Sequence, residues 1–342
     1  MTPPFSRPRN FDGIRSLLTR LPAVDSKAQA AAAAREPQLT KPPGSLGRLE
    51  DIASWLSGWQ GQHPPTLDRP GVLVFAGNHG VTAQGVSAFP SEVTVQMVAN
   101  FTAGGAAINQ LSDVAGADLS VIDLDLDRPT EDFSRRPAMS ERECADAFGT
   151  GMEAVDSDWD AVALGEMGIG NTTSAAAIAH AVCGRAAADW VGPGTGVADA
   201  ALARKIDVVA ESVERHRAAM TDGLEVLRHL GGRELAALAG AILAARFQRV
   251  PVVLDGYVTA AAAAALHACD PAVLDHCLTG HVSAEPGHTL LLDYLGQKPL
   301  VSLGMRLGEA SGAALALNVL RAAVACHAGM ATFAEAGVSD KD

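Results

Sequence analysis

The stretch Leu164–Ser174 combines three glycines, several hydroxyl side chains and one carboxylate within eleven residues. The glycines at positions 165, 168 and 170 let the backbone turn sharply and approach a ligand closely. An apolar run precedes the stretch and a small, helix-forming run follows it, so Thr172, Thr173 and Ser174 fall where they can cap a helix. The free N–H groups of a first helical turn suit an anion. The pattern therefore predicts a strand, a glycine loop and a helix that bind a phosphate.

Two glutamates stand out beside such loops. Glu166 would repel a bare phosphate, but it could face a cationic ring or a ribose hydroxyl; a solvated glutamate in an ordinary turn is the alternative. Glu309 follows Gly308 at an expected helix start, next to Met305 and Leu307. Apolar neighbours raise the pKa of a carboxyl and a helix N-terminus lowers it. A carboxylate so placed can act as a general base, whereas the simpler interpretation is a charge in a first helical turn.

A second glycine loop, Gly192–Gly196, precedes a helix that carries Arg204 and Lys205, and Lys205 is a candidate cation. Pro193 stands where a dinucleotide-binding loop needs a free N–H, and G-x-G-x-x-G is absent after the first expected strand, so a nicotinamide dehydrogenase is disfavoured. Neither a G-x-x-x-x-G-K-[ST] phosphate loop nor a G-x-S-x-G elbow occurs. What remains is two phosphate-compatible loops, one cation and two carboxylates.

A metal site is not expected. His281, Glu285 and His288 are close in sequence, and His79 could approach them, but H-E-x-x-H is absent and Pro286-Gly287 prevents a helical ligand face. Histidines that form hydrogen bonds at strand ends are the favoured interpretation.

The composition excludes several classes of partner. The net charge is 26 − 39 = −13, which disfavours nucleic acid and anionic membrane surfaces. The five cysteines show no C-x-x-C spacing, as expected for a reduced, cytoplasmic protein. The apolar segment 258–269 is too short to cross a bilayer. We expect a soluble protein without signal peptide, nucleic-acid partner or membrane association.

Six apolar runs must position these groups, and most stop at a glycine-rich or polar motif that a helix follows. We predict strands at 72–76, 119–122, 161–164, 187–191, 250–254 and 276–278. Helices are predicted at 14–19, 25–35, 48–60, 91–101, up to 111, 207–230, 234–247 and from 310 to about 327. The fold class is α/β, an open parallel sheet of about six strands flanked by helices, with the loops along one edge. Residues 61–309 would form the large catalytic domain, and residues 1–60 with 310–342 a small helical part.

These motifs resemble a known family, the nicotinate-nucleotide–dimethylbenzimidazole phosphoribosyltransferases. The matching strings, in unbroken order from about residue 40 to 327, are Lys41–Glu50, 165–173, Leu254–Gly256, Ser283–Glu285 and Met305–Glu309. The resemblance implies a Rossmann-like sheet, a small helical domain and a homodimer. It also implies transfer of the 5-phosphoribosyl group from nicotinate mononucleotide to 5,6-dimethylbenzimidazole, giving α-ribazole 5′-phosphate and nicotinate in cobalamin synthesis. No cofactor is expected, because a neutral pyridine leaves and neither pyrophosphate nor magnesium is needed.

The resemblance also implies residue roles. Glu309 takes the benzimidazole N–H proton while the other ring nitrogen attacks C1′ with a single inversion, and Glu166 lies at the reacting centre. The phosphate and ribose would be held by Gly168, Gly170, Asn171, Thr172, Thr173, Gly194, Thr195, Gly196 and Lys205. The base pocket would be lined by His79, Phe89, Met97, Met305 and Leu307.

The base half of the site departs from some relatives at Asn78, at Phe89 and at Gln96-Met97. The alternatives left open are the same donor with another base or a phenol as acceptor, and a nucleotide-binding protein without catalysis.

Overall fold

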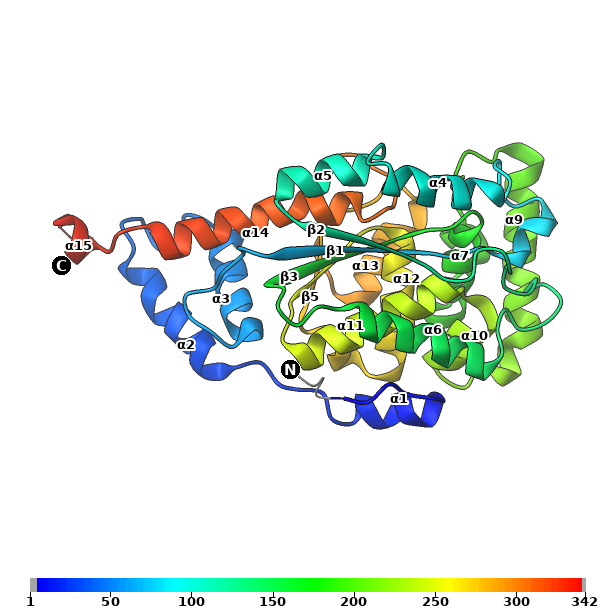
Figure 1. The fold of residues 1–342 in the computed structure, drawn as a ribbon, viewed down its shortest axis with the longest axis horizontal. Helices are drawn as coiled ribbons and strands as arrows, with labels where there is room; N and C mark the ends of the chain where they lie inside the picture. Colours follow the sequence, from blue (N-terminus) through cyan, green and yellow to red (C-terminus); the bar gives the residue numbers. More distant parts are fainter. Residues whose placement is uncertain (1–4, 340–342) are drawn as a thin grey trace.

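The computed structural model describes residues 5–339, which form an α/β fold around a parallel sheet (Figure 1). Within that range the sheet has five strands in the order β2-β1-β3-β4-β5, with every neighbouring pair parallel. The strands are β1 (Pro70–Ala76), β2 (Asp118–Asp123), β3 (Ala161–Met167), β4 (Val252–Leu254) and β5 (Cys277–Thr279). The strand order reverses between β1 and β3, and ligands of open α/β sheets bind outside the carboxyl ends of the strands at such a point.

Alternate residues of the strands enter two separate cores. In β1, Leu73 and Phe75 pack on one side, while Val72 and Val74 pack on the other. This follows from the two-residue period of a strand, and it explains why strands covered on both faces have continuous apolar sequences. The alternation therefore fixes which helices lie on which face of the sheet.

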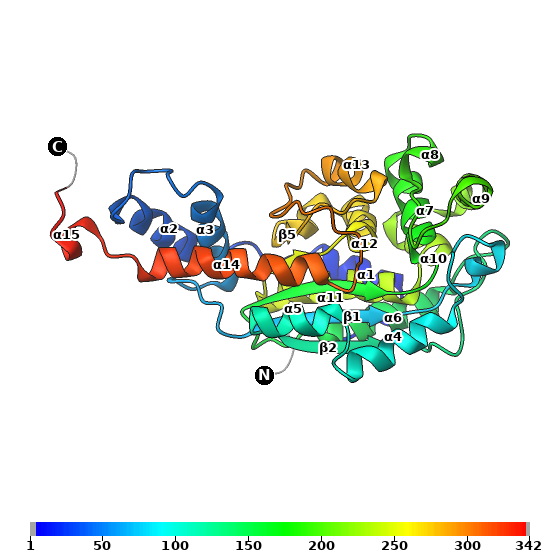
Figure 2. The same ribbon diagram turned by 90° about the horizontal axis from the view of Figure 1, so that it is seen from above.

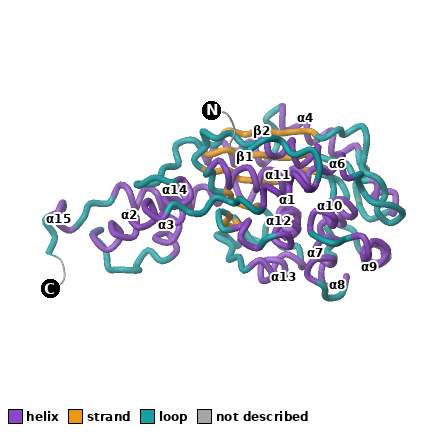
Figure 3. Tube along the Cα trace, turned by 90° about the horizontal axis from the view of Figure 1, so that it is seen from below, coloured by secondary structure: helices purple, strands orange, loops and turns teal. Residues whose placement is uncertain are grey.

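Helices cover both faces, as seen when the molecule is turned (Figures 2 and 3). The larger core is formed with α1 (Phe11–Leu18), α6 (Glu141–Ala154), α7 (Asn171–Cys183), α8 (Ala187–Trp190), α9 (Asp199–His216), α10 (Gly223–Leu230), α11 (Arg233–Gln248), α12 (Tyr257–Cys269) and α13 (Pro286–Leu295). The smaller core is formed with α3 (Arg48–Gln60), α4 (Glu92–Thr102), α5 (Ala107–Ala115) and α14 (Ser311–Gly329). The remaining helices are α2 (Ser26–Arg35) and α15 (Phe333–Ala336).

One end of the molecule is helical. Figure 2 shows α2, α3 and the end of α14 beside the sheet, with α15 beyond them. In contrast, α1 packs on the larger core through Phe11 and Ile14, although it lies within the expected helical segment 1–60. Residues 1–4 and 340–342 of that expected small part lie outside the described residues, and the division into two domains stays a prediction.

By length and composition α14 could cross a membrane. In this structure its small side chains lie on the sheet instead, where Ala313, Ala314 and Leu317 share a core with Val72 and Val74. About 44% of its most apolar stretch is buried, and the core helix of a globular protein can have the same length and hydropathy as a membrane span. The hydropathy of α14 is therefore accounted for by packing inside the fold.

Two predicted elements are wrong. The fourth expected strand, at 187–191, is instead the short helix α8, in which Asp189 accepts a hydrogen bond from the Ala186 N–H and the Trp190 indole donates to the Gly184 carbonyl at 2.7 Å. The expected single helix 207–230 is two helices, α9 and α10. The chain turns between them because Asp222 caps α10, its carboxylate accepting from the Glu225 N–H at 2.9 Å.

Candidate active site

A cavity of about 240 Å³ lies at the carboxyl ends of β3, β4 and β5, next to the reversal of strand order. Its walls come from segments that are far apart in sequence. The lining residues are Phe89, Glu166, Met167, Gly168, Ile169, Asn171, Thr172, Gly194, Thr195, Gly256, Tyr257, Val258, His281, Ser283, Glu285, Arg306, Leu307 and Gly308. The glycine loops predicted to bind a ligand thus meet in one place.

Of the two glutamates singled out in the sequence, Glu166 lines this cavity, whereas Glu309 is not among the lining residues and directly follows one of them, Gly308. Glu166 is the penultimate residue of β3, and its backbone carbonyl accepts a hydrogen bond from the Glu309 N–H at 3.0 Å. Both side chains are buried, with 6% and 5% of their residue surface exposed. The Glu309 backbone has a φ of 61°, in the left-handed region that non-glycine residues seldom occupy, which is typical of functional sites.

Burial raises the pKa of both carboxyls. The pKa of Glu309 rises to about 7, first because of burial and then because of the nearby negative charge of Asp255. The pKa of Glu166 rises well above its usual range for the same two reasons, with Glu234 and Glu309 adding to the shift. The Asn171 amide opposes it by donating to Glu166 Oε2. A base whose pKa is near neutrality is suited to proton transfer at neutral pH.

The buried Lys205 side chain bonds to both glycine-loop regions. Its Nζ donates to the Thr172 hydroxyl at 2.9 Å and to the Gly192 carbonyl at 3.1 Å. Burial lowers the pKa of Lys205 to about 8, and the opposite charge of Glu285 works against that shift. Lys205 therefore places a cation next to two side chains of the cavity wall.

The first turn of α7 offers fewer free N–H groups than the sequence suggested. The Ile169 N–H donates to the Thr94 hydroxyl at 3.1 Å, while the N–H groups of Asn171 and Thr173 donate to backbone carbonyls of the same turn. Thr172 lines the cavity, whereas Thr173 is fully buried. A ligand at this part of the wall would therefore bind mainly to side chains such as Thr172, because these backbone N–H groups already donate within the protein.

In the second loop, Gly194 and Thr195 line the cavity, while Gly196 lies just outside the lining. Gly194 and Gly196 have positive φ values of 54° and 119°, which explains the glycines at these positions. Arg306, which was not among the predicted site residues, donates from Nη1 to the Gly194 carbonyl at 2.9 Å and lines the same wall. The loop is thus flanked by two cations.

Of the five residues expected around the base, Phe89 and Leu307 line the cavity. Met97 packs instead against the smaller core, and the Met305 carbonyl accepts from the Ala284 N–H at 2.9 Å. The structure does not place Met97, Met305 or His79 among the lining residues. Further apolar or aromatic wall, not predicted from the sequence, comes from Met167, Ile169, Tyr257 and Val258. These residues could have been found from their positions at or just after the ends of β3 and β4.

His79 lies behind the first glycine loop, fully buried. Its Nε2 lies 2.5 Å from Glu234 Oε1 and its Nδ1 lies 3.0 Å from the Ser174 hydroxyl. Because a carboxylate accepts, Nε2 carries the proton and Nδ1 accepts from the hydroxyl. The histidine thus ties the loop after β1 to α7 and α11.

Of the histidines considered above as metal ligands, His288 accepts one hydrogen bond, whereas neither ring nitrogen of His281 has a hydrogen-bond partner among the described residues. His288 Nδ1 accepts from the Ser283 N–H at 2.8 Å, and burial together with His281 lowers the pKa of His288 to about 3. His281 Nε2 lies 3.4 Å from Asp255 Oδ1. Among residues 5–339, no group of three or more His, Cys, Asp or Glu side chains is arranged to hold a metal ion.

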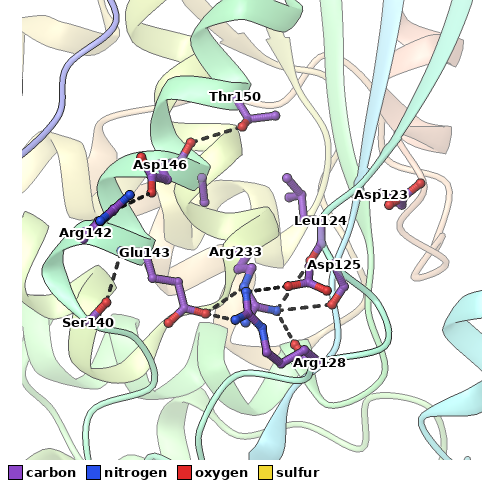
Figure 4. A pocket seen from close by; sticks show the side chains of 11 residues that line it. Asp123, Leu124, Asp125, Arg128, Ser140, Arg142, Glu143, Asp146, Thr150 and Arg233 are labelled. Carbon is purple, nitrogen blue, oxygen red and sulfur yellow. Dashed lines mark hydrogen bonds and ion pairs between the residues drawn. The ribbon is translucent and has the colours of Figure 1, made fainter.

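A larger hollow, of about 570 Å³, lies at the edge of the sheet beyond β2 (Figure 4). Its central cation, Arg233, is turned onto the protein itself, donating to the Glu143 carboxylate and to the backbone carbonyls of Leu124, Asp125 and Arg128. This arrangement indicates a structural ion pair that joins α6 to α11 and to the segment after β2.

The segment Lys41–Glu50 lies in the helical end of the molecule, away from the cavity (Figure 2). Lys41 Nζ forms ion pairs with Glu36 at 2.9 Å and Glu50 at 2.7 Å. The motif is therefore held rigid within its own chain.

Known proteins resemble this chain over nearly its full length. A family model described as phosphoribosyltransferase matches residues 21–338. A protein of Cereibacter sphaeroides strain KD131 named nicotinate-nucleotide–dimethylbenzimidazole phosphoribosyltransferase is 59% identical over 339 residues, covering 99% of each chain. A protein of Ruegeria pomeroyi with the same name is 62% identical over 326 residues, covering 95% of this chain and 96% of its own. The crystal structure of CobT from Thermus thermophilus matches with a TM-score of 0.86 and 42% identity, covering 92% of this chain and 100% of that one.

Proposed function

The chain belongs to the phosphoribosyltransferase family, and from this premise we propose that it transfers the 5-phosphoribosyl group of nicotinate mononucleotide to 5,6-dimethylbenzimidazole. The products are α-ribazole 5′-phosphate and nicotinate, a step of cobalamin synthesis. The observation that carries the proposal is a cavity lined by Glu166, with Glu309 bonded to the Glu166 backbone behind its wall, and with Arg306 and Lys205 bonded to its glycine loops. That arrangement suits a reaction in which a proton leaves the acceptor while an anionic phosphate is held in place.

Glu309 is the proposed general base. Glu309 Oε2 has no hydrogen-bond partner among the described residues, so an incoming N–H donor finds a free acceptor there. As the proton moves to Glu309, the other ring nitrogen attacks C1′ and the bond to the nicotinate nitrogen breaks. The pyridinium leaves as a neutral pyridine, and attack opposite the β-linked nicotinate gives the α-anomer.

Glu166 is proposed to lie against the ribose, where the positive charge that develops as the nicotinate bond stretches would favour its ionised form against the burial that raises its pKa. Its contact with the Asn171 amide keeps one oxygen engaged and fixes the side chain. Electrostatic stabilisation of this kind is effective in a buried site, since water does not screen it.

The phosphate is proposed to bind between Thr172, Gly194, Thr195, Lys205 and Arg306. Thr172 and Lys205 are already hydrogen-bonded to each other, so these donors are oriented before a ligand arrives. Charge-assisted hydrogen bonds to phosphate are roughly twice as strong as neutral ones. The protein's net charge of −13 would repel a phosphate at long range, and these local cations offset that repulsion.

We also propose that the active protein is a cytoplasmic homodimer. Phe89 and Leu307 line the cavity with 51% and 55% exposure, and Leu303, at 62%, lies four residues before Leu307. Exposed large apolar side chains such as these are typical of a surface that another chain covers.

The decisive experiment is incubation of the protein with nicotinate mononucleotide and 5,6-dimethylbenzimidazole, with nicotinate release and the product anomer followed by chromatography and NMR. We expect base-dependent release and the α-anomer. Release without added base would indicate hydrolysis, and release only with another base or a phenol would reassign the acceptor. Binding of the mononucleotide without release would indicate a non-catalytic nucleotide-binding protein.

A further inference from the structure

Asp255 holds the start of the helix that follows Glu309. It is the residue directly after β4, it is 1% exposed, and its Oδ1 accepts from the N–H groups of Gly312 at 2.8 Å and Ala313 at 3.0 Å. The residue at the cap position of α14, Ala310, has no polar side chain to do this. The cap of α14 is thus supplied by Asp255, the residue that follows β4, and not by the helix's own N-cap residue.

The turn held by this cap is strained. Glu309 and Ala310 both have φ values of 61°, and left-handed backbone at two successive non-glycine residues persists only when its surroundings impose it. Two further hydrogen bonds fix the turn, from the Glu309 N–H to the Glu166 carbonyl and from the Ser311 N–H to the Gly308 carbonyl, each at 3.0 Å. Asp255 is the side chain that anchors it from the helix side.

The Asp255 carboxylate also places a negative charge near Glu309. This charge contributes to the raised pKa of both Glu309 and Glu166. The other ionisable groups facing the pair are Glu234, behind Glu166, and His281, whose Nε2 lies 3.4 Å from Asp255.

We propose that Asp255 is a positioning residue for the transfer reaction, which holds the Glu309–Ala310 turn in its left-handed conformation and keeps a negative charge facing Glu309. The proposal rests on the proposed function, since it takes Glu309 to be the base. Asp255 would then have two roles, capping α14 and providing a negative charge, and different substitutions remove one role or both.

The test compares Asp255→Asn with Asp255→Ala. Asparagine keeps an oxygen that can accept from both N–H groups but removes the charge, whereas alanine removes both. For Asp255→Asn we expect the acid limb of the kcat–pH profile to move to lower pH by at least about half a unit, with the KM for nicotinate mononucleotide within about twofold of the parent. For Asp255→Ala we expect kcat to fall by a further factor of about 10 or more, because the turn is released.

Asp270→Asn serves as the matched control, since Asp270 caps a short helix remote from the cavity by accepting from the Ala272 N–H at 2.9 Å. Its profile should match that of the parent. A profile of Asp255→Asn superimposable on the parent's would overturn the proposal, even if Asp255→Ala fails to fold.

A second measurement does not depend on turnover. The Glu309 carboxyl is titrated by carbon NMR in the parent and in Asp255→Asn, with its resonance assigned by its loss in Glu309→Gln. A lower titration midpoint in Asp255→Asn supports the proposal, and an unchanged midpoint contradicts it. A parent protein that releases no nicotinate while this midpoint still shifts would contradict the proposed function alone.

Discussion

Among single residues, Glu166 and Glu309 differ in how their carboxylate oxygens are satisfied. Glu166 receives the Asn171 amide, whereas Glu309 Oε2 has no hydrogen-bond partner in the part of the chain that the structure describes. An unpaired acceptor in a buried site is unfavourable until a donor arrives. This difference favours Glu309 over Glu166 as the proposed proton acceptor.

Replacing Glu309 by glutamine should lower kcat roughly 10²–10⁴-fold, because a positioned base contributes about that factor. The parent enzyme should show an acid limb in kcat near pH 7, since the pKa of Glu309 is raised to about 7 and the base must be ionised. Initial rates of nicotinate release across pH check both. Glu211→Gln, an exposed position on α9, is the control, and near-parental turnover of Glu309→Gln would remove it from the role.

The same substitution should stabilise the folded protein above neutral pH. The folded-state pKa of Glu309, about 7, lies above its ordinary value of 4.5, so the folded state binds the extra proton between these values. The parent therefore loses stability relative to Glu309→Gln as pH rises from about 4.5 to 7, and the difference stays constant at higher pH. Urea unfolding of both proteins at several pH values measures this, and a difference that shrinks as pH rises would contradict the assigned shift.

Replacing Lys205 by methionine should raise the KM for nicotinate mononucleotide roughly 10–100-fold, the range expected on losing a hydrogen bond to a charged group. The reason is the loss of the buried cation that donates to Thr172 beside the proposed phosphate site. Arg204→Met on the same helix is the control, because Arg204 is exposed and bonds to Gln84. Steady-state kinetics with varied mononucleotide decide it, and an unchanged KM for Lys205→Met would place the phosphate elsewhere.

Among secondary-structure elements, β3 and the start of α14 contact each other next to Glu166 and Glu309. A Cβ on Gly165 would overlap the backbone of Ala310, which is why β3 has a glycine just before Glu166. The close approach brings Glu309 against Glu166 and leaves no room for a larger residue. This glycine is required by packing, whereas Gly170, Gly194 and Gly196 are required by their positive φ values.

Gly165→Ala should therefore destabilise the fold by roughly 1–3 kcal/mol through overpacking, and it should lower kcat at the same time. Gly329→Ala, at the end of α14 where a Cβ meets open space, should be neutral or slightly stabilising. Chemical denaturation of both variants gives the comparison. Equal stabilities for the two would show that β3 and α14 can separate without penalty.

The parallel sheet could be predicted from sequence because its strands are continuous apolar runs that end at glycines, and β1 and β3 were found in this way. The run 187–191 failed the same criterion because Asp189 and Trp190 bond locally and close a helical turn. Periodicity alone cannot separate such a short buried helix from a strand. The break between α9 and α10 was missed because the cap at Asp222 lies inside an otherwise helical pattern.

Sequence reasoning found the site residues that lie in local motifs and missed those whose partners are distant in the chain. Glu166, Glu309 and the glycine loops lie in local motifs, so sequence reasoning reached them. Arg306 and Asp255 act through partners far away in the chain, and nothing in their local sequence shows the contact. The family resemblance implied that His79 lines the base pocket, but its ring bonds to Glu234 and Ser174 and is not among the residues that line the cavity.

For the whole molecule, the homodimer proposal gives a direct prediction. The parent should have a solution mass twice the 35.2 kDa of one chain, and Leu303→Arg should lower it by placing a charge on the exposed apolar surface near the cavity. Val114→Arg, at a residue that is 71% exposed on α5, should leave the mass unchanged. Size-exclusion chromatography with light scattering measures all three, and a monomeric parent would rule the dimer out.

Helix α14 connects two distant parts of the molecule. Its 19 residues span roughly 28 Å, with the strained turn of Glu309 at one end and His327, which bonds to Glu36 at 2.6 Å, near the other. The same helix therefore contacts the helical end of the molecule at one end and carries the turn of Glu309 at the other. We expect shortening of the carboxyl terminus into α14 to disturb turnover before it disturbs the sheet.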